Sequence, residues 1–172
     1  MSGYPSGAEL TERVFDAMKD KADLATHSIL GLGFLAGIYI GLGGLFSGLV
    51  LSYAGDQFSG VVQVFAGAVF TLGLAAVLLA GAELFTGNTL MIGTAMTADL
   101  PMANVLRALS LAYLANLIGS LLLVALAFGA AVDQFGDGAI GKAIHALGEA
   151  KITKSAIVIF FSGVLANFLV CL

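Results

Sequence analysis

Long uncharged stretches constrain the fold of this chain more than any other feature. No Asp, Glu, Lys, Arg or His occurs in three runs of the sequence, which cover Ser28–Gly55, Gln57–Ala82 and Ala108–Val132. Each run exceeds the roughly 20 residues that an α-helix needs to cross a hydrocarbon core of about 30 Å. A fourth uncharged run, Ser155–Leu172, is close to that length. The pattern predicts an all-α membrane protein with four candidate spans.

The composition also indicates a lipid environment. Hydrophobic residues make up 59% of the 172 residues and charged residues only 10%, whereas soluble domains carry about 25% charge. The mean hydropathy is +1.03. A core of this size could not bury so much apolar surface, because a small domain leaves a large fraction of its surface exposed. We therefore expect the lipid bilayer to cover part of the helices.

Charge and cysteine content disfavour several classes of function. The net charge is −4, and the absence of a basic patch disfavours nucleic acid binding. The single cysteine, Cys171, excludes an intrachain disulfide framework and a cysteine-rich metal site. The sequence contains no histidine cluster and no nucleophile–base pair. We therefore expect no enzyme activity, no metal site and no cofactor.

The first 27 residues differ in character from the rest. Ser6 followed by Glu9 fits a capping box, which predicts a helix from about Ala8 to Asp23. Its apolar residues fall on one face, at Leu10, Val14, Ala17, Met18 and Ala22. We expect residues 1–27 to form a lead and an amphipathic helix that lies against the membrane face of its own protein. Binding of a partner is the alternative. Residues 28–172 then form the transmembrane domain.

The four spans are predicted at about 28–53, 57–96, 106–132 and 155–172. The first contains glycine at four-residue spacing, which lets neighbouring backbones approach closely, at Gly33, Gly37 and Gly41. Asn116 lies inside the third span, where a helix–helix hydrogen bond is a commoner role than ligand binding. A short helix is expected over about Ala139–Ala150, in the polar connection before the fourth span.

A polar segment, Gly81–Asn88, interrupts the second span. A carboxylate, a threonine and an asparagine lie there beside apolar residues and are bracketed by glycines. One interpretation is an ordinary helix end at Gly81 followed by an interfacial loop. The other is a helix broken near residues 81–89 and completed by Thr89–Met96. Irregular backbone at membrane depth is tolerated only inside protein or along a water-filled cavity, and broken helices are where transporters place substrate sites.

Two segments carry a resemblance to a known family. Leu78–Gly87 resembles the first signature of the formate/nitrite transporter family, and Gly163–Leu172 resembles the second. The form Glu-Leu-Phe-Thr-Gly inclines towards the nitrite-type branch. The resemblance implies an aquaporin-like channel fold of six spans in two inverted repeats, with a broken second helix, assembled as a homo-pentamer. This chain would supply the first repeat and the first helix of the second, with the C-terminal part of the fold absent.

The resemblance also implies a substrate pathway, to which this chain would contribute Phe70, Leu74, Glu83, Leu84, Phe85, Thr86, Lys151 and Asn167. Thr86 matches the threonine of the pore-lining loop, with Leu84 and Phe85 beside it. Phe70 and Leu74 match the apolar residues that narrow the pore. Glu83, Lys151 and Asn167 match members of a polar network. The family's pore histidine lies on the fifth span, which this chain does not contain. His27 and His145 do not replace it, because neither lies within a predicted span.

The implied function is transmembrane passage of small monovalent weak-acid anions such as formate, nitrite or hydrosulfide, with proton-linked transport as one form of it. A neutral-solute channel of the aquaporin type is an alternative, although paired Asn-Pro-Ala loops are absent. A non-transporting membrane scaffold or truncated subunit is another. We expect a multi-pass protein of the inner (plasma) membrane with a cytoplasmic N-terminus. That orientation places four basic residues inside, as the positive-inside rule favours, at Arg13, Lys19, Lys21 and Arg107.

Overall fold

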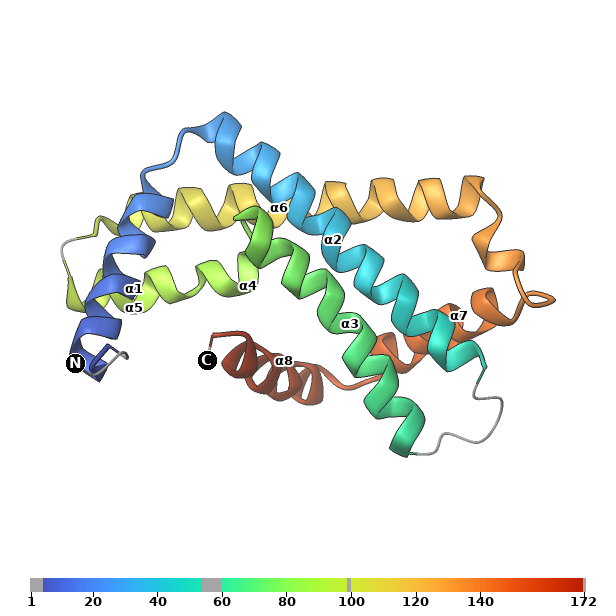
Figure 1. The fold of residues 1–172 in the computed structure, drawn as a ribbon. Coiled ribbons are helices and arrows are strands. Elements are labelled where there is room, and N and C mark those ends of the chain that lie inside the picture. The colour runs from blue at the N-terminus through green and yellow to red at the C-terminus, as the bar shows by residue number, and fades with distance from the viewer. Residues whose placement is uncertain (1–4, 54–59, 99, 172) are drawn as a thin grey trace.

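The computed structural model describes residues 5–53, 60–98 and 100–171, and Figure 1 shows their arrangement. The helices are α1 Gly7–Ala22, α2 Thr26–Ser52, α3 Gly60–Ala80, α4 Phe85–Asn88, α5 Leu90–Thr97, α6 Met102–Gly129, the 3-10 turn η1 Val132–Gln134, α7 Ala139–Ile152 and α8 Ala156–Val170. The described ranges contain no strand. The predicted all-α fold is therefore confirmed.

Three helices of the described chain, α2, α3 and α6, are long and apolar enough to cross a membrane. The predicted start of the second span at Gln57 lies outside the described residues. Helices α7 and α8 pass the same test only as a pair, and they are bent by 110° at their junction. Because α8 alone has 15 residues, fewer than the roughly 20 that a straight span needs, the fourth span at 155–172 stays a prediction.

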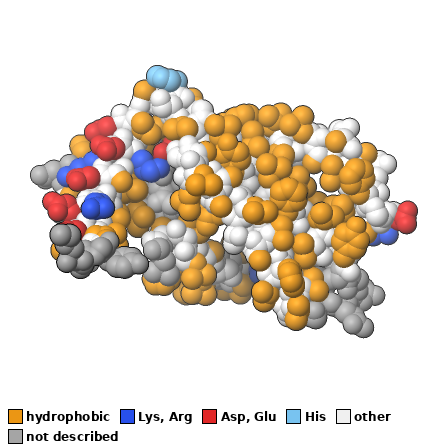
Figure 2. Space-filling view, viewed as in Figure 1, with side chains coloured by type: hydrophobic (Ala, Val, Ile, Leu, Met, Phe, Trp, Pro, Cys, Tyr) orange, Lys and Arg blue, Asp and Glu red, His pale blue; other side chains and the backbone are white. Residues whose placement is uncertain are grey.

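The molecular surface separates charge from apolar area. Figure 2 shows charged side chains gathered over α1 at one end, whereas hydrophobic side chains cover much of the face beyond it. Large apolar side chains are exposed on α3, α6 and α8, with Leu79 on α3 reaching 89% exposure. Soluble monomers rarely expose contiguous apolar patches of more than a few hundred Å². This surface suits lipid or apolar protein neighbours.

Glycine lets α2 pack closely against α6. A Cβ atom built on Gly37 would collide with the backbone carbonyl of Asn116, and one built on Gly119 would collide with the carbonyl of Phe34. Such contacts hold only while both positions lack a side chain. The predicted packing role of the glycine row is confirmed, because three glycines of α2 face α6, at Gly33, Gly37 and Gly41.

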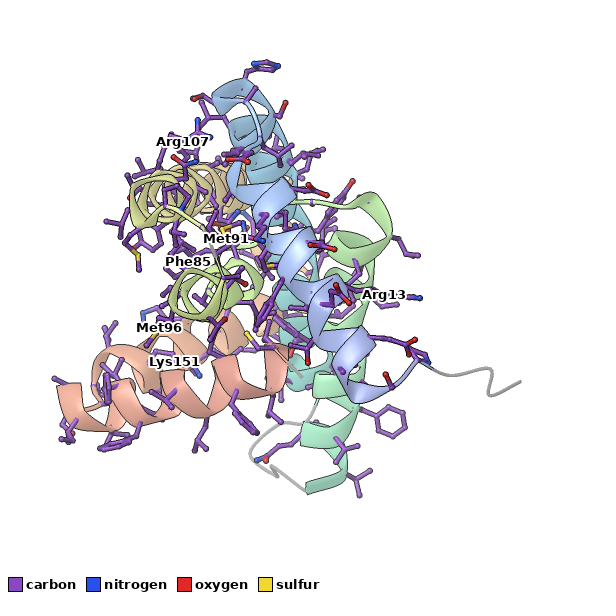
Figure 3. All side chains as sticks on the ribbon, turned by 90° about the vertical axis from the view of Figure 1, so that its left-hand side faces the viewer. Arg13, Phe85, Met91, Met96, Arg107 and Lys151 are labelled. Atoms are coloured by element: carbon purple, nitrogen blue, oxygen red, sulfur yellow. The ribbon has the colours of Figure 1, made fainter. Side chains whose placement is uncertain are left out.

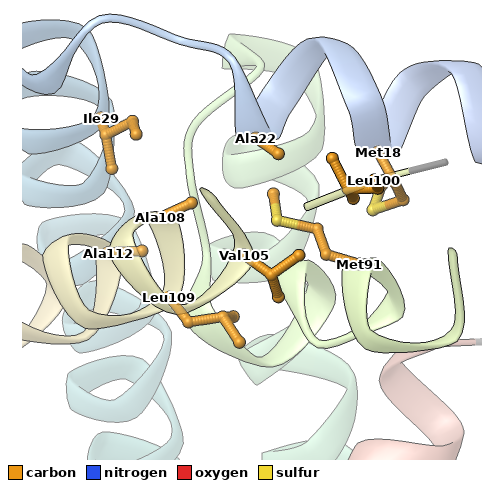
Figure 4. Close-up of a cluster of buried hydrophobic side chains, with 9 residues drawn as sticks. All are labelled: Met18, Ala22, Ile29, Met91, Leu100, Val105, Ala108, Leu109 and Ala112. Carbon is orange, nitrogen blue, oxygen red and sulfur yellow. The ribbon is translucent and has the colours of Figure 1, made fainter. Parts of the chain in front are cut away.

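Helix α1 folds back onto α5 and α6. Met18 and Ala22 of α1 are buried in a cluster with Met91 of α5 and Val105 of α6, as Figure 4 shows. The predicted capping box is present at the start of α1, where Ser6 and Glu9 exchange hydrogen bonds. The bond from the Ser6 backbone N–H lowers the pKa of the Glu9 carboxyl. As predicted, α1 lies against its own protein.

Arg107 of α6 fixes the connection between α1 and α2. Its guanidinium donates hydrogen bonds to the Leu24 carbonyl at 2.6 Å, to the Ala22 carbonyl at 3.3 Å and to the Thr26 hydroxyl at 3.0 Å. A guanidinium presents several N–H donors in a rigid plane, which suits it to hold three acceptors at once. The C-terminal end of α1 is thereby held next to α6.

Candidate functional site

The chain breaks after α3 and resumes as α4 and α5, an order of helices that fits the broken-helix interpretation, whereas completion of the second span by residues 89–96 stays a prediction. Helix α3 ends at Ala80, and Gly81 takes a φ of 62°, in the left-handed region that glycine adopts readily. The Gly81 N–H donates to the Leu78 carbonyl, and the Ala82 N–H donates to the Val77 carbonyl at 2.9 Å. These two bonds form a Schellman motif, which terminates a helix by a local signal. The chain becomes helical again only at Phe85.

Side chains and backbone of the neighbouring helices satisfy the backbone of the break. The Glu83 N–H donates to the Leu32 carbonyl of α2 at 3.3 Å. The Asn116 amide of α6 accepts from the Phe85 N–H at 2.9 Å and donates to the Glu83 carbonyl at 2.9 Å. It also donates to the Gly33 carbonyl of α2 at 2.8 Å, which is the helix–helix hydrogen bond favoured from the sequence. Irregular backbone at membrane depth needs such partners inside the protein, and Glu83 and Phe85 have them.

The Glu83 carboxylate is buried at 2% exposure and both of its oxygens are paired. Lys21 Nζ of α1 donates to Oε1 at 2.6 Å, and Asn88 Nδ2 donates to Oε2 at 2.7 Å. Burying a carboxylate is costly unless it is paired and hydrogen-bonded. Sequence reasoning missed the role of Lys21. The available signal was its place beside the apolar face of α1, one turn from Met18 and next to Ala22.

Two small cavities border the break. The first, of about 220 Å³, is lined by Lys21, Leu74, Leu84 and Asn88 among others. The second, of about 250 Å³, is lined by Leu84, Phe85, Thr86, Tyr113 and Asn116 among others. Leu84 lines both. Pockets for drug-sized ligands measure about 300–1,000 Å³, so these two suit smaller solutes. The structure thus brings Leu74, Leu84, Phe85 and Thr86 together around the break.

A wider groove of about 920 Å³ separates the break from α8 and is lined by Phe85, Thr89 and Asn167 among others. Asn167 Nδ2 donates to Thr89 Oγ1 at 2.9 Å, and Thr89 Oγ1 donates to the Thr86 carbonyl at 2.6 Å. Asn167 is therefore connected to the Thr86 backbone through Thr89. Sequence reasoning did not single out Thr89, although it follows the polar segment directly.

Other predicted pathway residues lie apart from this cluster. Lys151 is exposed near the end of α7, and within the described residues it makes no recorded hydrogen bond or ion pair with Asn167 or Glu83. Figure 3 shows Lys151 with the C-terminal helices and away from Phe85. Phe70 lies on α3 with 39% of its surface exposed. Of the predicted polar network, the structure places Glu83 and Asn167 on two sides of the break and leaves Lys151 outside.

Comparisons with known proteins agree with the resemblance in the two signatures. The sequence profile described as Formate/nitrite transporter matches residues 8–172. The chain is 32% identical to the uncharacterized transporter YrhG of Bacillus subtilis, over 95% of this chain and 62% of that protein. It is 32% identical to the formate channel BtFdhC of Bacillus thuringiensis, over 95% of this chain and 63% of the relative. For the nitrite transporter NirC of Escherichia coli, the values are 33%, 88% and 56%. The chain thus spans less than two thirds of the length of each of these relatives.

Proposed function

The chain belongs to the formate/nitrite transporter family, and we propose that it forms part of a transmembrane pathway for small monovalent weak-acid anions such as formate or nitrite. The observation that carries the proposal is the break after α3, whose apolar residues and Thr86 border two small cavities, one of them also lined by Lys21 of the partly buried Lys21–Glu83 pair. The names of the similar formate channel and nitrite transporter support this class of solute. The proposed role is transport, without catalysis or a cofactor.

The apolar lining would act as a filter. Leu74 and Leu84 share a cavity with Lys21. Moving an ion from water into apolar surroundings without compensating contacts costs many kcal/mol, so a hydrated ion would be held back. An ammonium has three N–H donors, and one of those of Lys21 donates to Glu83. Lys21 would attract an anion and offer it a further donor while the pair with Glu83 stays intact.

Thr86 would supply the next hydrogen bond. Thr86 lines the second cavity together with Phe85, and its hydroxyl makes no hydrogen bond within the described part of the chain. A hydroxyl can both donate and accept, so it could bind either the anion or its protonated acid. Because a neutral acid crosses an apolar segment at a much lower energetic cost than its anion, we include proton-linked passage and hydrosulfide in the proposal.

The proposed setting is a homo-pentamer in the inner (plasma) membrane, with α1 on the cytoplasmic side. The exposed apolar side chains of α3, α6 and α8 support contact with lipid or with neighbouring subunits. We retain Phe70, Lys151 and Asn167 as proposed pathway residues, Phe70 as an apolar constriction and Lys151 as a vestibule cation. Asn167 is proposed as a polar residue of the groove that Phe85 also lines.

Anion uptake into proteoliposomes tests the proposal, with the protein expressed from its whole gene. The unaltered protein should carry formate or nitrite, and Thr86→Val should lower uptake per assembled protein about tenfold, equivalent to about 1.4 kcal/mol. Thr71→Val is the matched control, because the Thr71 hydroxyl donates to the Ala68 carbonyl of its own helix and should not affect uptake. Absence of uptake by the unaltered protein, or equal effects of both substitutions, would contradict the proposal.

A further inference from the structure

We propose that Asn116 is the positioning residue of this pathway: it caps α4 from a neighbouring helix and thereby sets where Phe85 stands and which anions pass. The claim about which anions pass rests on the proposed function, whereas the claim about the position of Phe85 does not. The first N–H groups of a helix have no partner within the helix. A side chain at the N-cap position usually accepts from one of them. The N-cap of α4 is Leu84, which makes no side-chain cap hydrogen bond, and Asn116 Oδ1 accepts from the first N–H, that of Phe85.

The orientation of the Asn116 amide is fixed by its three partners. Both of its N–H donors are used, one by the Glu83 carbonyl and one by the Gly33 carbonyl, so its oxygen must face Phe85. The three partners are the Gly33 carbonyl on α2 and, on either side of residue 84, the Glu83 carbonyl and the Phe85 N–H. One side chain therefore ties α2, α6 and the break together.

The close approach of α2 and α6 makes this arrangement sterically feasible. Gly37 lies against the Asn116 backbone, and Gly119 lies against the backbone of α2 at Phe34. Without that approach, the short Asn116 side chain could not reach Gly33 and the break at once. The glycine packing of the two helices therefore serves the position of the break as well as stability.

A second contact from α6 holds the Phe85 side chain. The rings of Phe85 and Tyr113 meet edge to face, with centroids 5.4 Å apart and planes at 71°. Tyr113 lies three residues before Asn116, so both side chains project from one face of α6. Asn116 thus fixes the Phe85 backbone while Tyr113 orients its ring, at the cavity that Thr86 also lines.

Two readouts test the proposal on the protein expressed from its whole gene. The first is hydrogen exchange of the amides of residues 83–88, which Asn116→Leu should accelerate at least tenfold, equivalent to about 1.4 kcal/mol. The variant removes both hydrogen bonds from Asn116 to the break, so local opening becomes easier. Exchange in α2, α3 and α6 should stay unchanged. The second is the ratio of lactate to formate uptake, which should rise about fivefold, equivalent to about 1 kcal/mol, because a Phe85 that is no longer held in place leaves more room at the cavity that Thr86 also lines.

Tyr113→Leu provides a second test that removes only the ring contact and leaves the three hydrogen bonds of Asn116 in place. It should raise the lactate to formate ratio in the same direction, even if Asn116→Leu does not fold. Tyr113→Phe is the conservative variant and should keep the uptake ratio of the unaltered protein, because it retains the ring. Thr71→Val is the control outside the site, because the Thr71 hydroxyl donates to the Ala68 carbonyl of its own helix.

The outcomes separate this inference from the proposed function. The positioning role of Asn116 would be overturned if amide exchange at residues 83–88 stayed unaltered or if exchange rose equally in all helices. It would also be overturned if exchange rose only at residues 83–88 while the lactate to formate uptake ratio stayed unchanged. Absence of any anion uptake by the unaltered protein would overturn the proposed function, and exchange alone would then decide whether Asn116 positions Phe85.

Discussion

The break at residues 81–89 and the C-terminal helices α7 and α8 both contain residues of the proposed pathway, but their surroundings contrast. In the break, Glu83 and Asn88 are each 2% exposed and are hydrogen-bonded to each other. In α8, every residue from 156 to 166 is exposed. The helix is linked to the break by the hydrogen bond that Asn167 Nδ2 donates to Thr89 Oγ1. Lys21 pairs with Glu83, whereas Lys151 is exposed.

The difference shows what fixes a polar group inside a membrane protein. Buried polar groups must find partners, and those of Glu83 and Phe85 come from α1, α2, α6 and the break itself, all within one chain. The position of Lys21 is therefore a property of this fold. Lys151 is exposed, so its proposed role in the pathway would depend on a neighbour such as another subunit or lipid.

The largest expected effect comes from removing the glycine contact on which the break depends. Gly37→Leu should prevent folding, because its side chain would collide with the Asn116 backbone and force α2 and α6 apart. Overpacking costs about 1–3 kcal/mol even where side chains can move, and here the obstacle is backbone. Gly31→Leu is the control, since a Cβ at Gly31 meets no atom within 4 Å. Size-exclusion profiles and thermal unfolding in detergent measure both variants, and equal behaviour would contradict the packing account.

A smaller effect should distinguish the two lysines. Lys21→Met should destabilise the protein by about 3 kcal/mol, because it leaves the buried Glu83 carboxylate without its cation. Lys151→Met should change the free energy of unfolding by less than about 0.5 kcal/mol, as expected for an exposed residue. In anion uptake, however, we expect Lys151→Met to lower flux about tenfold, equivalent to about 1.4 kcal/mol.

The double variant Lys21→Met/Glu83→Gln sharpens the test, because removing both charges should recover much of the lost stability. Denaturant unfolding in detergent gives the four free energies of the cycle. A loss for Lys151→Met as large as that for Lys21→Met would remove the contrast between the two regions.

Local patterns allowed most of the fold to be predicted. Uncharged runs located α2, α3 and α6, Ser6 with Glu9 located the start of α1, and glycine spacing identified the face of α2 that packs on α6. The Schellman motif at Gly81 explains why the second helix breaks where the sequence turns polar. Each of these signals lies within a few residues of the feature that it predicts.

Contacts between distant residues could not be read in the same way. Lys21 and Glu83 are 62 positions apart, and Phe85 and Asn116 are 31 apart. Both contacts exist because α1 folds back and because glycines bring α2 next to α6. From the sequence, Asn116 was expected to make a helix–helix hydrogen bond, and it does so with Gly33. Its second role, capping α4 at Phe85, could not be predicted without knowing where the break lies.

The accessibility of residue 86 tests the central claim most directly, namely that the break lines an anion pathway. Thr86→Cys in the protein expressed from its whole gene would be treated with a small membrane-impermeant thiol reagent, and the unaltered chain with its native Cys171 would give the background. The account predicts that the reagent reacts at residue 86, blocks formate or nitrite uptake, and is slowed by either anion. Absence of reaction at residue 86, or reaction that leaves uptake intact, would contradict it.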